Sequence, residues 1–333
     1  MKAPTIHDPF GERRAADVRA QLSVLGCDFS TESNDQSLLD LAIDAFGGLP
    51  RFKLGGRPPQ LNVSLVLNNH DGTWPHGAEP PQPVLSSGTG LLCATMDAGN
   101  FAIVDVASAR ALICVSNAML RHPYHVRYEL IEFAFLTLAS RVQSLVPLHA
   151  ACVGRNDSGL LLMGATGAGK STLSLHALAG DMQFLSEDSA FVAPTSLRIA
   201  GVPNYLYVQR DSLDFLKSGA LRQQIQRSPQ IRRRSGVQKY QTNLREVPGE
   251  IARVPLQLAA IVMLSRRTVK RQPALKLLPP KTFLTRLRRE QPYAAGMANW
   301  QEFEARIANR PVYELRRPQH PDIAVRALQA LLG

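Results

Sequence analysis

The sequence of 333 residues has only four cysteines, Cys27, Cys93, Cys114 and Cys152, and no pair of them has C-x-x-C spacing. This scatter argues against a disulfide framework and against a zinc site, so we expect buried free thiols. The apolar runs also stop well short of the roughly 20 residues that a membrane-spanning helix needs. Residues 1–4 are followed by polar ones and lack the apolar segment of a signal peptide, so we expect a cytoplasmic protein with no membrane partner.

Acidic residues are in the minority. The chain has 27 Asp and Glu against 38 Lys and Arg, a formal net charge of +11, and the arginines concentrate beyond residue 205. Such a basic surface would favour an acidic protein, a peptide or a nucleic acid as partner, and it is equally consistent with a solvated basic face. Because the sequence contains no zinc finger, aromatic-rich RNA motif or basic zipper, we expect no nucleic-acid partner.

The pattern of the chain changes near residue 120, and the length suffices for two domains. We expect a smaller α+β domain over 1–120, with a substrate-binding or assembly role. Its helices are expected over 10–25 and 37–46, a turn over 69–72, a proline-rich loop over 75–83, and strands over 61–67, 90–94, 101–106 and 111–115. The strands are short and separated by turn residues, which predicts a mainly antiparallel β unit.

Residues 121–333 are expected to form an α/β domain. Apolar residues at helical spacing predict a long buried helix over 124–145, stopped by Pro147. Strands are expected over 148–153, 160–163, 183–192, 258–264 and 311–315, a hairpin turn over 156–159, and helices over 281–289 and 322–332. Between them, residues 218–250 are polar and arginine-rich, and we expect a long, mobile basic excursion there.

One glycine-rich stretch fits the pattern G-x-x-x-x-G-K-[ST] at every fixed position. It consists of Gly164, Ala165, Thr166, Gly167, Ala168, Gly169, Lys170, Ser171 and Thr172. Its small residues let successive backbone N–H groups turn toward an anion, and a helix starting near Lys170 points its positive dipole end at the same place. Lys170 supplies a charge for the β and γ phosphates, and the Ser171 hydroxyl can bind Mg²⁺. The stretch therefore predicts ATP and Mg²⁺ as cofactors, although such a loop does not distinguish adenine from guanine.

Three chemical features fall within 40 residues: His149, the phosphate loop, and the adjacent acids Glu187 and Asp188 on a strand that is otherwise apolar. Neighbouring strand ends of a parallel sheet meet at one edge, so we expect these features to form one site. One carboxylate could bind Mg²⁺ while the other takes a proton from an attacking hydroxyl. Adjacent strand residues point to opposite faces, so one alternative is that one of the two carboxylates is only a surface residue. A second alternative is that His149 has only a structural role.

This order of motifs resembles the HPr kinase/phosphorylase family and the bacterial kinases related to it. The resemblance is carried by Leu148–Ala151, the phosphate loop and Ser186–Asp188, and it extends more loosely over 120–333. It implies a P-loop nucleotide-binding domain of the HPr kinase/phosphoenolpyruvate carboxykinase type. It also implies ATP-dependent phosphorylation of a serine-type hydroxyl on a protein or peptide.

By position, the resemblance implies Glu187 as the base for the acceptor hydroxyl and Asp188 as the partner of Ser171 at Mg²⁺. It implies that Lys170 holds the β and γ phosphates and that His149 contacts the transferred phosphoryl group. The sequence departs from the family in having Glu187 where an aspartate is usual. It also lacks the glycine-rich C-terminal signature of true HPr kinases, so HPr itself is not assigned as the acceptor.

Several alternatives stay open at this stage. Kinases related to this family look associated with peptide-modifying pathways, so a ribosomally made peptide precursor is one acceptor that the resemblance suggests. A small-molecule hydroxyl kinase and a nucleotide-switched binding protein without phosphotransfer would use the same loop. HPr kinases are hexameric, so a homo-oligomer is a further alternative. A transporter-type ATPase is disfavoured because no L-S-G-G-Q signature is present.

Overall fold

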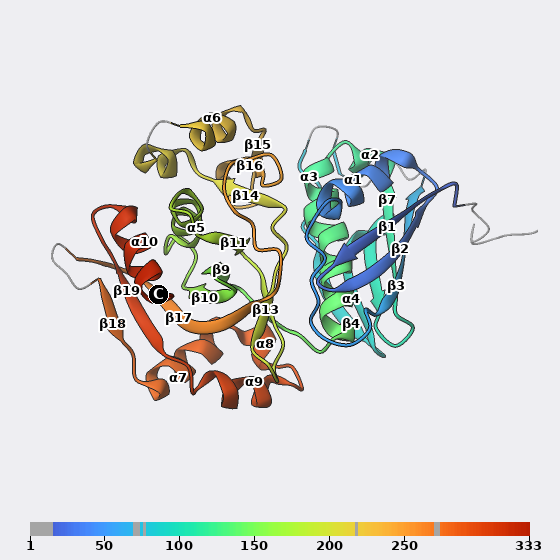
Figure 1. Cartoon of the computed structure of the whole chain (residues 1–333). Helices are drawn as coiled ribbons and strands as arrows, with labels where there is room; N and C mark the ends of the chain where they lie inside the picture. The colour runs from blue at the N-terminus through green and yellow to red at the C-terminus, as the bar shows by residue number, and fades with distance from the viewer. Residues whose placement is uncertain (1–15, 69–73, 76–77, 217–218, 270–273) are drawn as a thin grey trace, which may run out of the picture. The chain divides into compact units, whose positions relative to one another are not determined.

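The computed structural model describes residues 16–68, 74–75, 78–216, 219–269 and 274–333 (Figure 1). The chain divides into two compact units. The first comprises the chain up to Leu22, Asp28–Gly47 and Gln60–Leu138, and the second comprises Ser23–Cys27, Gly48–Pro59 and Ala139–Gly333. Both units combine helices with β-sheets, which confirms the α/β class. The assignment of functional domains to 1–120 and 121–333 stays a prediction.

The first unit is built on a seven-stranded sheet in the order β1-β2-β3-β7-β6-β5-β4. Its strands are β1 Val18–Val24, β2 Cys27–Ser33, β3 Gln60–Asn68, β4 Val84–Gly88, β5 Leu91–Asp97, β6 Asn100–Asp105 and β7 Arg110–Ser116. Strand β3 is parallel to both β2 and β7, whereas β4 to β7 pair antiparallel in succession. The strands expected here are confirmed, but the sheet is mixed.

The helix expected over 10–25 is wrong wherever that range is described, because Val18–Val24 is strand β1. The physical reason is the strict alternation of apolar and polar residues in this segment, which puts Leu22 and Val24 on one buried face. Residues 10–15 and the turn expected over 69–72 lie outside the described residues. Those residues of the expected proline-rich loop that are described, Pro75 and 78–83, form neither helix nor strand.

The helices of the first unit follow the sequence pattern more closely. Helix α1 spans Gln36–Phe46, and the carboxylate of its N-cap residue Asp35 accepts a hydrogen bond from the Leu38 N–H at 2.9 Å. The long helix expected over 124–145 is confirmed as α3 Pro123–His125, a π-helical segment η1 Val126–Ile131, and α4 Glu132–Val142. It ends before Pro147, which lies in a strand. Short helix α2, Asn117–Leu120, precedes it.

The second unit is built on a nine-stranded sheet with the order β11-β9-β10-β17-β13-β12-β8, in which β19 also pairs with β17 and with β18. The strands are β8 Val146–Leu148, β9 Ala151–Arg155, β10 Ser158–Met163, β11 Gln183–Ser186, β12 Ala190–Val192, β13 Arg198–Ala200, β17 Leu256–Thr268, β18 Leu275–Leu277 and β19 Val312–Arg317. Strand β10 is parallel to β17 and forms a hairpin with β9 through Asn156 and Asp157, which have the positive φ angles of a tight turn.

Helices α5 Lys170–Ala179 and α10 Pro321–Ala330 cover part of this sheet. Leu173 and Ala177 of α5 share a buried core with Leu162 of β10 and with Val325 and Leu328 of α10. Helices α7 Pro280–Glu290, α8 Pro292–Ala295 and α9 Trp300–Ile307 follow one another between β18 and β19 (Figure 1). The expected strands over 258–264 and 311–315 and the expected helices over 281–289 and 322–332 are thereby confirmed.

Two predicted strands are interrupted, and both breaks fall on candidate site residues. The range 148–153 divides into β8 and β9 at His149 and Ala150, and 183–192 divides into β11 and β12 at 187–189. Antiparallel pairing joins Leu148 to Ala190 on one side of the breaks and Cys152 to Ser186 on the other. The two segments thus lie side by side with a gap in the ladder between them. Strand β9 also separates β11 from β10, so the acidic strand does not adjoin the phosphate-loop strand directly.

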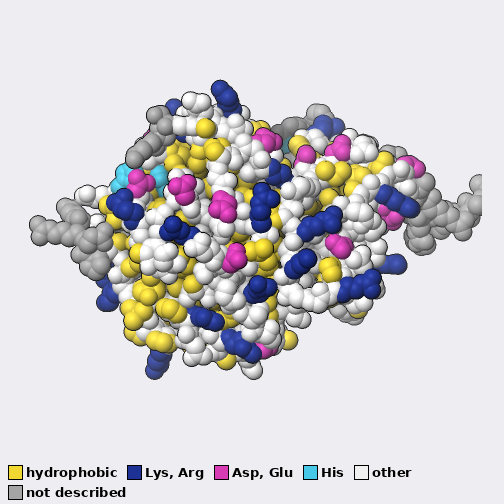
Figure 2. All heavy atoms as spheres, in the orientation of Figure 1, with side chains coloured by type: hydrophobic (Ala, Val, Ile, Leu, Met, Phe, Trp, Pro, Cys, Tyr) yellow, Lys and Arg dark blue, Asp and Glu magenta, His cyan; other side chains and the backbone are white. Residues whose placement is uncertain are grey.

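The expected basic excursion over 218–250 is largely regular structure instead. It contains helix α6 Ala220–Arg227 and strands β15 Gln230–Arg232 and β16 Gln238–Asn243. Strand β16 pairs with β15 and with β14 Tyr205–Val208 in a three-stranded sheet. The 3₁₀ helix η2 Arg210–Phe215 lies between β14 and α6 in the chain. Leu206 and Val208 of this sheet share a buried core with Leu175 and Leu178 of α5, and this packing stabilises the regular structure of the segment. On the face drawn in Figure 2, Lys and Arg side chains are scattered singly.

The structure shows the state of the cysteines and the length of the apolar helices. All four cysteines are free, with Cys27 and Cys152 buried and Cys93 and Cys114 partly buried. Across the described part of the chain, no helix combines the length and apolar character needed to cross a membrane.

The Gly154 position in β9 provides a test of the packing. A Cβ atom there would lie 2.4 Å from the Ser158 carbonyl oxygen and 2.6 Å from Leu256 Cδ1. Gly154→Ala should therefore lower the free energy of unfolding by about 1–3 kcal/mol, measured by urea denaturation. Gly296→Ala is the matched control, since its nearest atoms would lie 3.6 Å away. Equal midpoints for the two variants would contradict this account of the packing.

Candidate active site

The phosphate loop occupies the predicted place, between the end of β10 at Met163 and the start of α5 at Lys170. Gly167 and Gly169 have φ angles of 77° and 101°, in the left-handed region that favours glycine. The N-cap of α5 is Gly169, and no side chain makes a capping hydrogen bond there. The first-turn N–H groups of α5 therefore have no side-chain acceptor at the cap, which is the arrangement that suits an anion.

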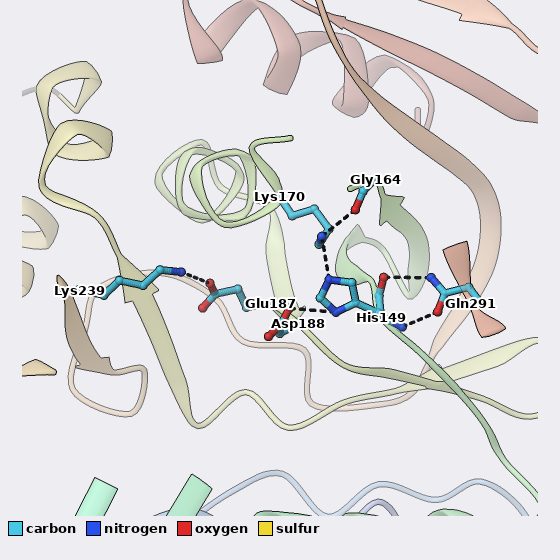
Figure 3. Close-up of polar contacts among 7 residues, drawn as sticks. All are labelled: His149, Gly164, Lys170, Glu187, Asp188, Lys239 and Gln291. Carbon is cyan, nitrogen blue, oxygen red and sulfur yellow. Dashed lines mark hydrogen bonds and ion pairs between the residues drawn. The ribbon is translucent and has the colours of Figure 1, made fainter. Parts of the chain in front are cut away.

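The Lys170 side chain is buried at the base of this loop. Its Nζ donates a hydrogen bond to the Gly164 carbonyl oxygen at 2.8 Å and lies 3.1 Å from His149 Nε2 (Figure 3). Burial lowers the pKa of Lys170, while the carboxylates of Asp188, Glu290 and Glu187 act in the opposite direction. This direct contact is consistent with the prediction that Lys170 and His149 belong to one site.

His149 lies in the gap between β8 and β9 and contacts a second predicted residue. Its Nδ1 is 3.2 Å from Asp188 Oδ1, and both side chains are about half exposed, at 48% and 43%. Because the ammonium group of Lys170 can only donate, Nε2 of His149 must accept from it. The ring proton then belongs on Nδ1, where it is donated to Asp188.

Glu187 points to different partners from those of its neighbour Asp188. Its buried carboxylate accepts a hydrogen bond from the Tyr207 N–H at 2.7 Å and lies 4.0 Å from Lys239 Nζ. Burial raises the pKa of Glu187, and the contacts with Lys239, Ser171 and Tyr207 lower it. Glu187 thus pairs with residues of β14 and β16, whereas Asp188 pairs with the histidine.

The remaining loop residues have distinct surroundings. Ala165, Thr166 and Gly167 form the exposed tip, and Ala168 packs against the core. Thr172 lies in the first turn of α5, and its Oγ1 is 2.8 Å from the Ser212 hydroxyl. A role of each in nucleotide binding stays a prediction.

Three residues at this site escaped the sequence reasoning. Gln291 forms two hydrogen bonds with the backbone of His149, Lys239 reaches Glu187, and Arg266 donates to the Thr166 carbonyl. Each is at least 50 residues from its partner, so no local motif marks it. Only Arg266 had a usable signal, because it follows the expected strand 258–264, whose end could meet the loop at one sheet edge.

The site residues fit ATP and Mg²⁺. Ser171 and Glu187 supply oxygen atoms, which are the ligands that Mg²⁺ prefers. Within the described ranges, no three or more His, Cys, Asp or Glu residues cluster as a metal site. A magnesium ion here would complete its coordination with phosphate oxygens and water, as is usual for nucleotide-bound Mg²⁺.

Comparisons with known proteins identify no family for this chain. No family model matches the chain, and no curated protein matches it in sequence. Among solved structures, it is similar to the HPr(Ser) kinase/phosphatase from Coxiella burnetii, with a TM-score of 0.28 and 12% identity over 55% of this chain and 88% of that chain. A likeness of this size carries no argument about function.

Substitution of Lys170 tests the nucleotide site. Lys170→Ala should weaken Mg·ATP binding roughly 10- to 100-fold, measured by isothermal titration calorimetry, because it removes charge-assisted hydrogen bonds to phosphate. Arg198→Ala makes the same change in net charge on an exposed residue of β13, which pairs with the start of β17 rather than with its loop-proximal end. It should leave the affinity within about twofold. Equal losses in both variants would contradict a specific role of Lys170.

Proposed function

We propose that this protein is an ATP-dependent phosphotransferase that phosphorylates a serine-type hydroxyl on a protein or peptide. The observation that carries the proposal is the half-exposed Asp188–His149 pair beside the phosphate loop, in which His149 Nδ1 lies 3.2 Å from Asp188 Oδ1 and His149 Nε2 lies 3.1 Å from Lys170 Nζ. Binding a nucleotide needs the loop and a metal ligand. A second, half-exposed carboxylate–histidine pair is what a hydroxyl acceptor requires.

The contacts favour a definite division of roles. The loop N–H groups and Lys170 would hold the β and γ phosphates, and Ser171 with Glu187 would hold Mg²⁺, which neutralises charge on the phosphate oxygens when bound. Asp188 would then accept the proton of the acceptor hydroxyl. That oxygen bonds to the γ-phosphorus as the bond to the ADP oxygen breaks. This exchanges the roles that the family resemblance implied for Glu187 and Asp188.

Two features support the exchange. Glu187 is buried, accepts a hydrogen bond from the Tyr207 N–H and lies 4.0 Å from Lys239 Nζ, so an acceptor from outside cannot reach it easily. Asp188 and His149 are about half exposed, so a hydroxyl on a large substrate can approach them. A general base must come within hydrogen-bonding reach of the proton that it removes.

Phosphoryl transfer itself can be measured directly. The purified protein should be incubated with Mg²⁺ and γ-labelled ATP, with and without candidate peptides encoded near its gene, and every species weighed by intact mass spectrometry. We expect one peptide to gain about 80 Da, the mass of one phosphoryl group, and to gain none with Lys170→Ala. Transfer only to free serine or a sugar would instead make it a small-molecule kinase. Bound ATP without transfer would make it a nucleotide-switched binding protein.

The division of roles predicts opposite phenotypes for the two acids. Glu187→Gln should weaken Mn²⁺ binding in the ADP complex about 10-fold or more, measured by electron paramagnetic resonance. Asp188→Asn should leave that affinity within about twofold and lower the rate of phosphoryl transfer about 10²- to 10⁴-fold. If Asp188→Asn weakens Mn²⁺ binding and Glu187→Gln does not, the roles implied by the resemblance are the right ones.

A further inference from the structure

The backbone of His149 lies where the strand ladder is broken. Pairing stops at Leu148 with Ala190 and resumes at Cys152 with Ser186, so the His149 N–H and carbonyl have no strand partner there. Backbone N–H and carbonyl groups that leave a strand ladder take another hydrogen-bond partner, from a side chain or from water.

The side chain of Gln291 fills this place. Its Oε1 accepts a hydrogen bond from the His149 N–H at 2.8 Å, and its Nε2 donates to the His149 carbonyl at 3.1 Å (Figure 3). A primary amide presents one acceptor and donors side by side, much as a peptide unit does. Gln291 therefore pairs with His149 as a neighbouring strand would, without adding a strand.

Gln291 is itself firmly held. It lies between α7 and α8, where its N–H donates to the Leu287 carbonyl and its own carbonyl accepts from the Ala295 N–H, both at 2.9 Å. Only 6% of its surface is exposed. Its amide thus has a fixed position from which it can define the backbone of His149.

The backbone position decides what the histidine ring can reach. The ring must place Nε2 near Lys170 and Nδ1 near Asp188 at once, at 3.1 and 3.2 Å, with only two side-chain torsions to adjust. A shift of the backbone by a fraction of an ångström would lengthen one of these contacts.

We propose that Gln291 is a positioning residue for the phosphotransfer site, which holds His149 between Lys170 and Asp188. This inference rests on the proposed function. Both side-chain hydrogen bonds of Gln291 go to the backbone of His149, so it acts through His149 and is not itself catalytic.

A double-mutant cycle separates positioning from a merely structural role. Gln291→Met keeps the approximate volume and removes both hydrogen bonds. It should lower kcat for phosphoryl transfer roughly 10-fold with KM for ATP within twofold, but cause no further loss in a His149→Ala background. An equal fold-loss in both backgrounds would overturn the proposal, because a structural defect does not depend on His149.

Two further variants serve as a control and as a replacement for Gln291→Met. Gln257→Met removes one side-chain bond to the Ser196 carbonyl at the opposite end of β17, and it should leave kcat unchanged. Gln291→Asn keeps the amide but shortens it by one methylene, and it replaces Gln291→Met if that variant does not fold, as judged by circular dichroism and urea unfolding. The same loss of kcat and the same dependence on His149 are expected for it.

A second measurement does not depend on activity. Nitrogen-15 NMR of labelled histidine rings at one fixed pH, assigned with His149→Ala, should report the Nδ1–H tautomer for His149 and a mixture of tautomers in Gln291→Met. An unchanged tautomer would overturn the positioning role. A changed tautomer in a protein that transfers no phosphoryl group would uphold Gln291 as the anchor of His149 while refuting the proposed function.

Discussion

The site depends on one interruption of a hydrogen-bonded ladder. Two antiparallel segments pair on both sides of His149 and 187–189 but not at them. A continuous ladder would fix these residues in the alternating pattern of a strand, with Glu187 and Asp188 on opposite faces. At the gap, Glu187 instead pairs with Lys239 and the Tyr207 N–H, and Asp188 pairs with His149. The Gln291 amide satisfies the His149 backbone that the gap exposes.

Two groups of opposite charge are buried near this gap. Lys170 and Glu187 are both buried, and burial alone lowers the pKa of the lysine and raises that of the acid. Each is compensated by nearby groups: Lys170 by the carboxylates and the Gly164 carbonyl, Glu187 by Lys239, Ser171 and the Tyr207 N–H. Removing one member of such a set leaves another charge poorly solvated, so the members act together.

The arginine-rich segment illustrates how composition can mislead. Its polarity favoured a mobile excursion, yet Ile225 and Leu244 of this segment share a buried core with Leu175 and Leu178 of α5, and Lys239 lies 4.0 Å from Glu187. At least one of its basic residues therefore contacts a candidate site residue. Strand β1 shows the converse case, because its apolar and polar residues alternate as in a strand although we predict a helix there from the sequence.

From the sequence alone follow the strand and the helix that flank the glycine-rich loop, and the expectation that His149, Lys170 and Asp188 lie together, which agrees with their contacts. These features are local, since glycine spacing and apolar runs act over about ten residues. Tertiary structure decided which acid pairs with His149, where the ladder breaks, and that Lys239, Arg266 and Gln291 contact the candidate site residues. The contacts of Lys239, Arg266 and Gln291 join residues that are 52 to 142 positions apart. No local pattern encodes them, because they arise only when the sheet brings distant segments together.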